Sequence, residues 1–317
     1  MSKAQKKAYR AKEQEFIKEA DVICVTCTYS RCVKLDDHKF PFVLIDEAGQ
    51  ASEPECLIPL SKGAQQAILV GDHKQLRPFS RSFDNPVSLF ERKVYSGLEA
   101  RMLSTQYRMH PDIAEFSSRN FYDGKLLNGV SAVERQLEGR FPSPISTNST
   151  FFWHVPNFEA KIENSYYNQY QACIILHILQ TLIENKIDPK NIGVITPYIC
   201  QKSKIKELNK RNKVVQNIED VEIATVDSFQ GREKEIILIS TVRSNNKDQI
   251  GFVKDERRMN VMLTRAKRLM IVVGNSYSLK SSEHWETFLR QYHRKNLIFE
   301  EGKLGCLEMK TDLFYED

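Results

Sequence analysis

Short apolar runs that alternate with helical patterns are the feature that most constrains the fold of this chain. Strands in a parallel sheet are buried on both faces, so they read as nearly continuous apolar runs, and the helices between them cover those faces. The alternation therefore predicts an α/β fold. The predicted strands are Phe42 to Ile45, Ala67 to Val70, Phe151 to Val155, Ile192 to Ile195, Val221 to Thr225, Glu235 to Ser240 and Leu269 to Val273.

Apolar residues at three- and four-residue spacing predict the helices between these strands. The predicted helices are Pro111 to Asn120, Tyr166 to Asn185, Gln201 to Asn212, Glu256 to Lys267 and Glu283 to Lys295. One polar, Pro/Ser-rich segment interrupts the pattern and predicts a linker between two domains. We expect a first domain at 1–130, a linker at 131–150, a second domain at 151–300 and a C-terminal tail at 301–317.

Composition limits the class of protein. At 317 residues with a 41% hydrophobic fraction, the chain can fill two cores. No apolar run is long enough for a transmembrane helix, and the charged N-terminus lacks the apolar centre of a signal peptide. Seven cysteines, an odd number, indicate reduced thiols. We expect no membrane partner and a cytoplasmic location, with the nucleus as the alternative, and the net charge of +5 permits a polyanionic partner.

Two adjacent carboxylates, Asp46 and Glu47, follow the first predicted strand. Ligands of α/β proteins gather at the carboxyl ends of parallel strands, so this pair lies where chemistry is expected. The first acid can hold Mg²⁺ and the second can polarise an attacking water. The alternative is an ordinary polar turn after a strand.

The strand at 67–70 ends in a second polar turn that contains Gly71, Asp72 and Gln75. Gly71 permits a tight exit from the strand, Asp72 caps the turn, and Gln75 can reach a terminal phosphate or its attacking water. The two acid-bearing strand ends are close in sequence, and we expect them to form neighbouring sides of one nucleotide cleft.

The string Gln106-Tyr107-Arg108-Met109-His110-Pro111 precedes the next helix. Pro111 suits the first helical turn, which leaves Tyr107 and Arg108 in the preceding loop. Arginine can complement a transferring phosphoryl group, and tyrosine can stack on a base. The alternative is a surface charge beside a half-buried ring.

Two segments of the second domain carry further candidates. The strand at 221–225 leads into a polar loop in which Gly231 allows backbone to approach a ligand. In the predicted helix 256–267, Arg258 and Arg265 lie seven residues apart on one face beside an apolar face. Arg265 is either an arginine finger or part of the solvated side of a packing helix.

These strings, in this order, resemble the motifs of superfamily 1B helicases of the up-frameshift type. The resemblance extends from about Ala20 to about Tyr292. It implies two RecA-like domains of the P-loop NTPase type, with ATP and Mg²⁺ in the cleft between them and single-stranded RNA lying across both. It also implies a monomeric, ATP-hydrolysing motor that steps along RNA in RNA surveillance, or nonsense-mediated mRNA decay, with surveillance proteins as partners.

The resemblance also implies a role for each matching residue. In the first domain, Asp46 serves Mg²⁺, Glu47 the hydrolytic water and Gln75 the γ-phosphate. Arg108 and Arg265 clamp the phosphates. The residues implied to bind nucleotide are Tyr107, on adenine, and Gly231 and Glu233, which couple nucleotide to RNA; those implied to touch the RNA backbone are Thr196, Pro197, Tyr198, Asp227 and Ser228.

The chain also departs from the family pattern. The phosphate loop G-x-x-x-x-G-K-[ST], which the family carries before the position of residue 20, does not occur in this sequence. We therefore expect the first domain to be incomplete, with strand edges and apolar surface exposed. Two alternatives stay open: a catalytically silent RNA- or protein-binding remnant, and a motor of the same superfamily that moves on DNA.

Cys24, Cys27, Cys32 and His38 have spacings that could suit zinc. Cys24, however, lies in an apolar pattern at 22–25 that is typical of a strand, and the resemblance places all four residues in the sheet and following loop of the first domain. We expect no metal at these residues.

Overall fold

The protein, described by a computed structural model over residues 2–80 and 86–300, consists of two compact units at 1–101 and 102–317. Residues 102–130, which the sequence grouped with the first domain, lie in the second unit. They belong there because helix α4 (Pro111–Phe121) packs its apolar face on that unit: the ring of Phe116 meets Phe288 edge-on at 5.1 Å. The expected tail at 301–317 lies outside the described residues.

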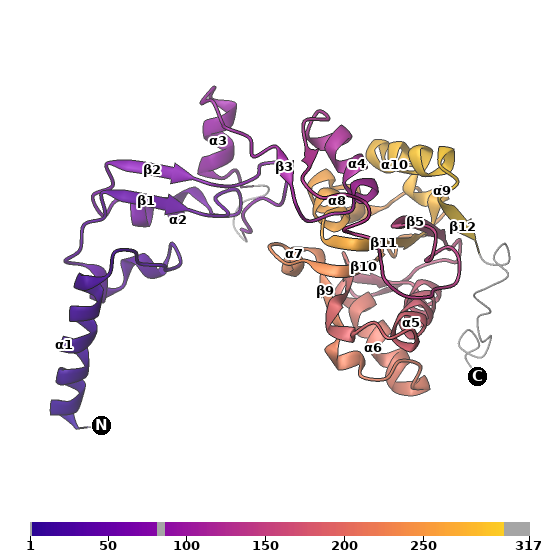
Figure 1. Ribbon diagram of the computed structural model, residues 1–317, viewed down its shortest axis with the longest axis horizontal. Coiled ribbons are helices and arrows are strands. Elements are labelled where there is room, and N and C mark those ends of the chain that lie inside the picture. The colour runs from indigo at the N-terminus through magenta and orange to yellow at the C-terminus, as the bar shows by residue number, and fades with distance from the viewer. Residues whose placement is uncertain (1, 81–85, 301–317) are drawn as a thin grey trace. The chain divides into compact units, whose positions relative to one another are not determined.

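A six-stranded parallel sheet forms the centre of the second unit, in the order β12-β5-β11-β10-β8-β9 (Figure 1). The predicted α/β class is confirmed, and all five strands predicted for this region are present. The short edge strand β12 was missed, because it lacks a long apolar run. The bounds are β5 (Thr150–His154), β8 (Ile192–Thr196), β9 (Glu222–Thr225), β10 (Lys234–Ser240), β11 (Ala266–Gly274) and β12 (Ile298–Glu300).

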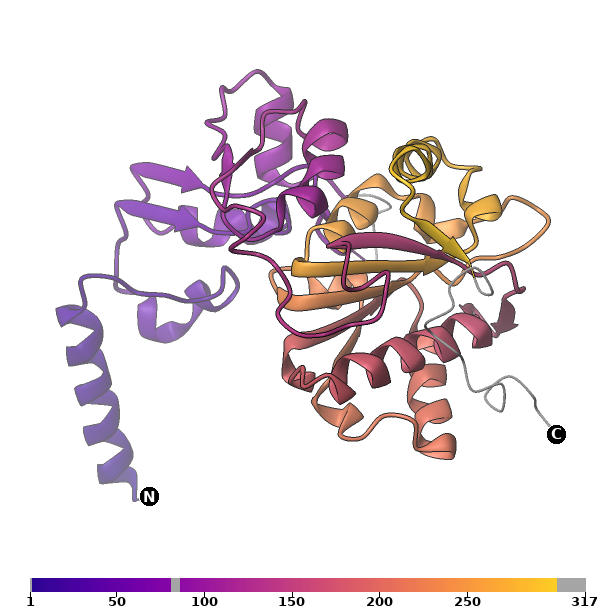
Figure 2. The same ribbon diagram turned by 45° about the vertical axis from the view of Figure 1, so that its right-hand side comes forward.

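Helices cover both faces of this sheet. One face is covered by α5 (Gln169–Glu184) and α6 (Ile199–Asn212), and the other by α4, α8 (Glu256–Leu263) and α10 (Glu283–Arg294) (Figures 1 and 2). Most residues of the central strands are buried for this reason. The remaining elements of the unit are β3 (Thr105–Gln106), β4 (Leu127–Asn128), β6 (Ala160–Ile162), β7 (Ser165–Tyr167), α7 (Val226–Phe229) and α9 (Ser276–Leu279).

Two of the helix predictions need correction. The helix predicted at 256–267 ends at Leu263, and Arg265 lies beyond it, so Arg258 and Arg265 do not share a helix face. The cause is strand pairing: Ala266 already pairs with Lys234 at the start of β11, which takes these residues out of the helix. Likewise, residues 165–167 form β7, paired with β6, before α5 begins at Gln169.

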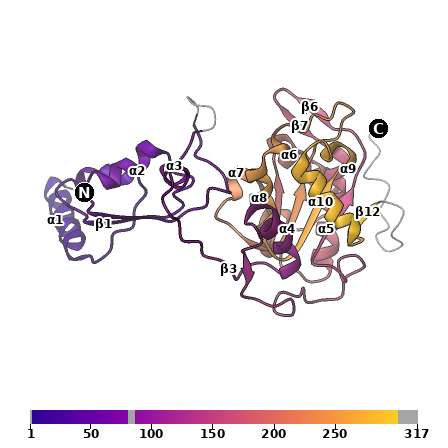
Figure 3. The ribbon, with the colours of Figure 1, turned by 90° about the horizontal axis from the view of Figure 1, so that it is seen from above.

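A buried ion pair fastens the β6–β7 hairpin to the sheet, and the hairpin lies beside α6 in Figure 3. Nε of Arg243 donates to Oε1 of Glu159 at 2.9 Å, and both side chains are almost fully buried. Glu159 also accepts from the backbone N–H of Ser244 and from Nδ2 of Asn245. The guanidinium of Arg243 lies 4.1 Å from the ring centroid of Tyr166. The carboxylate of Glu159 thus accepts hydrogen bonds from Arg243, Ser244 and Asn245.

We expect Glu159→Gln to lower the free energy of unfolding by about 1.5–3 kcal/mol, because it leaves the buried guanidinium of Arg243 without its counter-charge. Urea unfolding followed by circular dichroism measures this change. The matched control is Glu286→Gln, which removes an exposed charge from the i,i+4 pair with Arg290 and should change little. Equal effects of the two substitutions on the free energy of unfolding would contradict a stabilising role for the buried Glu159–Arg243 pair.

Among its described residues, the first unit is built around two parallel strands, β1 (Phe42–Ile45) and β2 (Gln66–Leu69), which pair in register. Helix α2 (Glu53–Leu60) lies against one face (Figure 1). The other elements are α1 (Lys3–Glu19) and α3 (Leu89–Tyr95). The core is small, with Ile45, Ala48, Cys56 and Leu89 buried at its centre.

Large apolar side chains of this small sheet are exposed. Phe42 is 74% and Leu44 63% exposed on β1, and Ile68 on β2 is half-exposed. The expectation of exposed apolar surface in the first domain is thus confirmed, and that of strands covered on both faces is wrong for β1 and β2. The strand expected at 22–25 does not form either, because no neighbouring strand among the described residues pairs with it.

Candidate functional site

The carboxylates of Asp46 and Glu47 lie in the turn that ends β1, and both side chains are exposed. The backbone N–H of Glu47 donates to Oδ1 of Asp46 at 2.9 Å, and Nε2 of Gln50 donates to Oε2 of Glu47 at 2.8 Å. Glu47 has a φ of +51°, which is uncommon for a side chain other than glycine. The turn thus holds two acids in solvent at the carboxyl end of a strand.

The turn after β2 lies directly against the turn after β1. The N–H of Ala48 donates to the carbonyl of Val70 at 2.8 Å, and a Cβ on Gly71 would stand only 2.7 Å from the nitrogen of Gly49. Side chains at these two glycines would force the turns apart. The prediction that the two strand ends are neighbours is therefore confirmed.

Gln75 is held by the acid of its own turn. Its Nε2 donates to Oδ2 of Asp72 at 2.9 Å, and Oδ1 of Asp72 accepts from the N–H of Lys74 at 2.8 Å. Nearby, Arg77 makes two hydrogen bonds to the buried carboxylate of Glu91, at 2.9 and 2.6 Å. Arg77 thus has a structural role in this unit.

In the second unit, the loop with Tyr107 and Arg108 is shaped by the side chain of Gln106. Its Oε1 accepts from the N–H groups of Arg108 and Met109, at 2.9 and 2.7 Å, and its Nε2 donates to the carbonyl of Met109 at 2.9 Å. The loop is thereby closed before α4 starts at Pro111. Tyr107 is 66% exposed, as a residue that stacks on a ligand must be.

Arg108 pairs with Glu233, the residue before β10. Nε of Arg108 lies 2.5 Å from Oε2 of Glu233, and Nη1 donates to the carbonyl of Thr264 at 3.0 Å. Nζ of Lys267 lies 3.1 Å from the same carboxylate. Burial opposes ionisation of Glu233, but the hydrogen bonds from Arg108 and Lys267 outweigh it and hold the pKa of the carboxyl below its ordinary value. The hydrogen bond to Glu233 likewise raises the pKa of Lys267.

Arg265 follows Thr264, whose carbonyl accepts from Arg108, and its side chain is buried, with 2% exposure. Its Nε donates to the carbonyl of Val261 at 3.0 Å and its Nη2 to Oγ1 of Thr264 at 2.9 Å. The structure thus brings Arg108, Glu233 and Arg265 to the amino-terminal ends of strands β10 and β11. Gly231 has a φ of +74° and open space around its Cα, consistent with an exposed turn that a ligand can approach.

Sequence reasoning missed two residues that position Tyr107. Arg135, in the segment expected to be a linker, donates to the carbonyls of Tyr107 at 2.6 Å and Arg108 at 2.8 Å. Gly129 lies flat against the tyrosine ring, where a Cβ would stand 2.3 Å from Cε1. No motif marked either residue, because their role depends on contacts across at least 22 residues of sequence.

The two loops expected to touch RNA differ in exposure. Thr196 and Tyr198 are buried, so within this loop Pro197 and the backbone offer more contact surface than those side chains. Nη1 of Arg243 donates to the phenol of Tyr198 at 3.3 Å, and burial raises the pKa of that phenol. Asp227 and Ser228 are exposed, and Asp227 pairs with Nε of Arg258 at 3.2 Å.

Comparison with known proteins shows the family to which the chain belongs. A family profile described as "AAA domain" matches residues 86–277, and a second profile with the same description matches residues 1–82. The chain belongs to the AAA-domain family. The resemblance to up-frameshift helicases is also confirmed, since curated relatives named as regulators of nonsense transcripts or as an ATP-dependent helicase are about 40% identical over nearly the whole chain.

Three relatives of this AAA-domain chain illustrate the match. The "Regulator of nonsense transcripts 1 homolog" of Arabidopsis thaliana is 41% identical over 98% of the chain and 26% of its own length. The protein "Regulator of nonsense transcripts 1" of Dictyostelium discoideum is 40% identical over 94% and 23%. "ATP-dependent helicase NAM7" of Saccharomyces cerevisiae is 42% identical over 96% and 32%. The chain thus spans about a quarter to a third of the length of these relatives.

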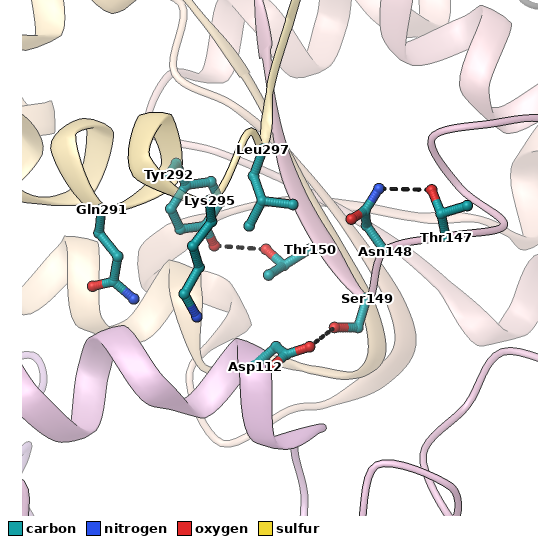
Figure 4. A pocket seen from close by; sticks show the side chains of 9 residues that line it. All are labelled: Asp112, Thr147, Asn148, Ser149, Thr150, Gln291, Tyr292, Lys295 and Leu297. Atoms are coloured by element: carbon teal, nitrogen blue, oxygen red, sulfur yellow. Dashed lines mark hydrogen bonds between the residues drawn. The ribbon is translucent and has the colours of Figure 1, made fainter.

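A small polar pocket of about 180 Å³ lies elsewhere in the second unit of this AAA-domain chain (Figure 4). Oγ1 of Thr150 and the phenol of Tyr292 share a buried hydrogen bond of 2.6 Å on its wall, and Oγ of Ser149 donates to Asp112 at 3.3 Å. Burial raises the pKa of Tyr292. None of the residues predicted for the site lines this pocket, so we assign it no part in the site.

The described residues contain no group of three or more His, Cys, Asp or Glu side chains placed to hold a metal ion. Cys27 packs against the core around Cys56, and burial raises the pKa of Cys56 to about 11. Within the same residues, no helix has the length and apolar character to cross a membrane.

Proposed function

We propose that this chain is the part of a superfamily 1 motor that hydrolyses ATP and moves along single-stranded RNA. The observation that carries the proposal is the cluster of Arg108, Glu233 and Arg265 at the amino-terminal ends of β10 and β11. Enzymes that hydrolyse ATP need cationic side chains that stabilise the charge on the transferring phosphate. The first unit adds the acids that such a reaction requires.

The turn after β1 fits a hydrated Mg²⁺ ion. Asp46 and Asp72 offer exposed or partly exposed carboxylate oxygens at neighbouring strand ends, and Mg²⁺ prefers oxygen ligands with several retained waters. Asp46 would hold the ion, which supplies positive charge to the phosphates. Glu47, held by Gln50, would take the proton of the attacking water, and Gln75 would leave Asp72 to meet the γ-phosphate.

Arg108 and Arg265 would stabilise the charge that develops on the phosphates. Each has a protein partner that a phosphate can replace: the carboxylate of Glu233 for Arg108, and Thr264 with Val261 for Arg265. Tyr107 would stack on adenine, with its ring held against Gly129. When Arg108 moves from Glu233 to a phosphate, Glu233 loses a partner. The resulting change of conformation would reach the loop at Asp227 and Ser228 through Gly231.

The names of the relatives, which speak of nonsense transcripts, support RNA as the track and RNA surveillance as the process. We also propose that the motor works as a monomer in the cytoplasm, with surveillance proteins as partners.

RNA-stimulated ATP hydrolysis is the test. We expect a single-stranded RNA oligomer to raise the rate of phosphate release more than a DNA oligomer of the same length does. The chain should be measured beside a longer version that carries a G-x-x-x-x-G-K-[ST] segment before residue 1. Hydrolysis by neither version would overturn the motor and favour a binding role, and preferential stimulation by DNA would overturn the RNA track.

A further inference from the structure

We propose that Phe252, together with the guanidinium of Arg258, forms a platform on which a base of single-stranded nucleic acid stacks. The inference rests on the proposed function, because it names a contact of the same nucleic-acid track. It assigns a role to an aromatic residue that belongs to neither of the loops expected to bind RNA.

Phe252 is an exposed aromatic side chain on a fixed piece of backbone. It is 59% exposed, whereas its neighbour Val253 is fully buried and accepts a hydrogen bond at its carbonyl from Nε1 of Trp285 at 2.8 Å. Ile250, before the turn, is buried as well. The ring is thus presented outward by a short 3₁₀ turn, Gly251–Lys254, that is anchored on both sides.

Gly251 shows how closely this turn is pressed onto the unit. Its φ is +54°, and a Cβ there would stand 2.7 Å from Nη1 of Arg243 and 3.0 Å from the phenol oxygen of Tyr198. Arg243 itself is fixed by its buried ion pair with Glu159. A side chain at Gly251 would displace the turn, so the position of Phe252 is set by the buried network beneath it.

Phe252 lies between the two loops for which we expect RNA contacts. Its ring centroid is 6.1 Å from that of Tyr198, in the loop at 196–198. The guanidinium of Arg258 lies 5.3 Å from the same ring centroid, and Arg258 pairs with Asp227 at 3.2 Å. A strand that follows both loops must therefore pass the exposed ring.

The chemistry of this surface suits single-stranded nucleic acid. Aromatic rings and arginine planes bind unpaired bases by stacking, whatever the base, and nearby cations bind the phosphates. Lys254 supplies an exposed cation on the same turn. Loss of one stacked base weakens binding by about tenfold.

The test measures binding of the full chain to a single-stranded RNA oligomer that contains 2-aminopurine, whose fluorescence falls when it stacks. We expect Phe252→Ala to weaken binding about tenfold and to reduce the quenching, with the salt dependence unchanged because no charge is lost. Phe252→Tyr should restore both. Lys254→Ala should instead lower the slope of log affinity against log salt by about 0.7, as for one lost phosphate contact.

Val133→Ala is the control, since it removes an 80% exposed apolar side chain from a loop outside this platform. Thermal unfolding of each variant checks that the fold is kept. If the chain binds RNA but Phe252→Ala binds and quenches as the parent does, the platform is overturned while the proposed function stands. If the parent chain binds no single-stranded RNA, both are overturned.

Discussion

Arg265→Ala should lower the rate constant of ATP hydrolysis by about a thousandfold or more, because an arginine that meets the transferring phosphate stabilises charge present only in the transition state. Affinity for nucleotide should change far less. Steady-state measurement of kcat and KM in the version of the protein that hydrolyses ATP separates the two effects.

Hydrogen bonds hold the guanidinium of Arg265 in place. The guanidinium is buried against the end of α8 and bonded to Val261 and Thr264. Thr264 also accepts, at its carbonyl, a hydrogen bond from Arg108. Thr264 therefore accepts a hydrogen bond from each of the two arginines that we assign to the phosphates.

Because Arg265 is buried, its removal also disturbs packing, and controls must separate the two effects. Arg265→Lys keeps the charge but lacks the planar fork, so we expect it to fold and to remain slow. Arg268→Ala is the matched control: this arginine, on β11 three residues after Arg265, pairs with Glu235 at 2.8 Å and has no assigned role at the phosphates. A mild loss of turnover in a folded Arg265→Ala protein would make the residue structural.

Glu47→Gln should lower the rate of ATP hydrolysis by a factor of about 10²–10⁴, which is the usual contribution of a general base. The amide has nearly the same shape as the carboxylate, but it cannot take a proton from water. Binding of ATP and RNA should persist, since Glu47 is exposed and the turn is held by the backbone bond between Ala48 and Val70. Phosphate release and nucleotide binding are the two measurements.

Glu53→Gln provides the same chemical change in the same unit. Glu53 starts α2 and pairs with Arg92 through a hydrogen bond of 2.9 Å. We expect its hydrolysis rate to match that of the parent protein. An unchanged rate in Glu47→Gln, or an equal loss in both variants, would count against Glu47 as the base.

The sequence predicted the parts of the fold that depend on local pattern. The strand at 42–45 was predicted with the bounds that β1 has, and the central strands of the second sheet were predicted to within a few residues. Their apolar runs are long enough to stand out because both faces are buried. The edge strand β12, with only three residues, carries no such signal.

Errors arose where a distant contact overrides local pattern. Residues 264–267 continue a helical spacing, yet pairing between β10 and β11 takes Ala266 into a strand. Residues 102–130 were predicted as part of the first domain because no polar break precedes them, yet the ring of Phe116 packs on Phe288 in the second unit. Neither partner can be identified from periodicity, since each lies far along the chain.

The sequence by itself determined the α/β class, the family, and the residues placed at the ends of the strands. It could do so because motif order and hydrophobic period are properties of neighbouring residues. Only the tertiary structure decided that Arg108 faces Glu233, that Arg265 is buried, that Arg135 holds the loop of Tyr107, and that Phe252 lies exposed between two loops. Those relations join residues 27 to 125 positions apart or depend on burial, which folding alone creates.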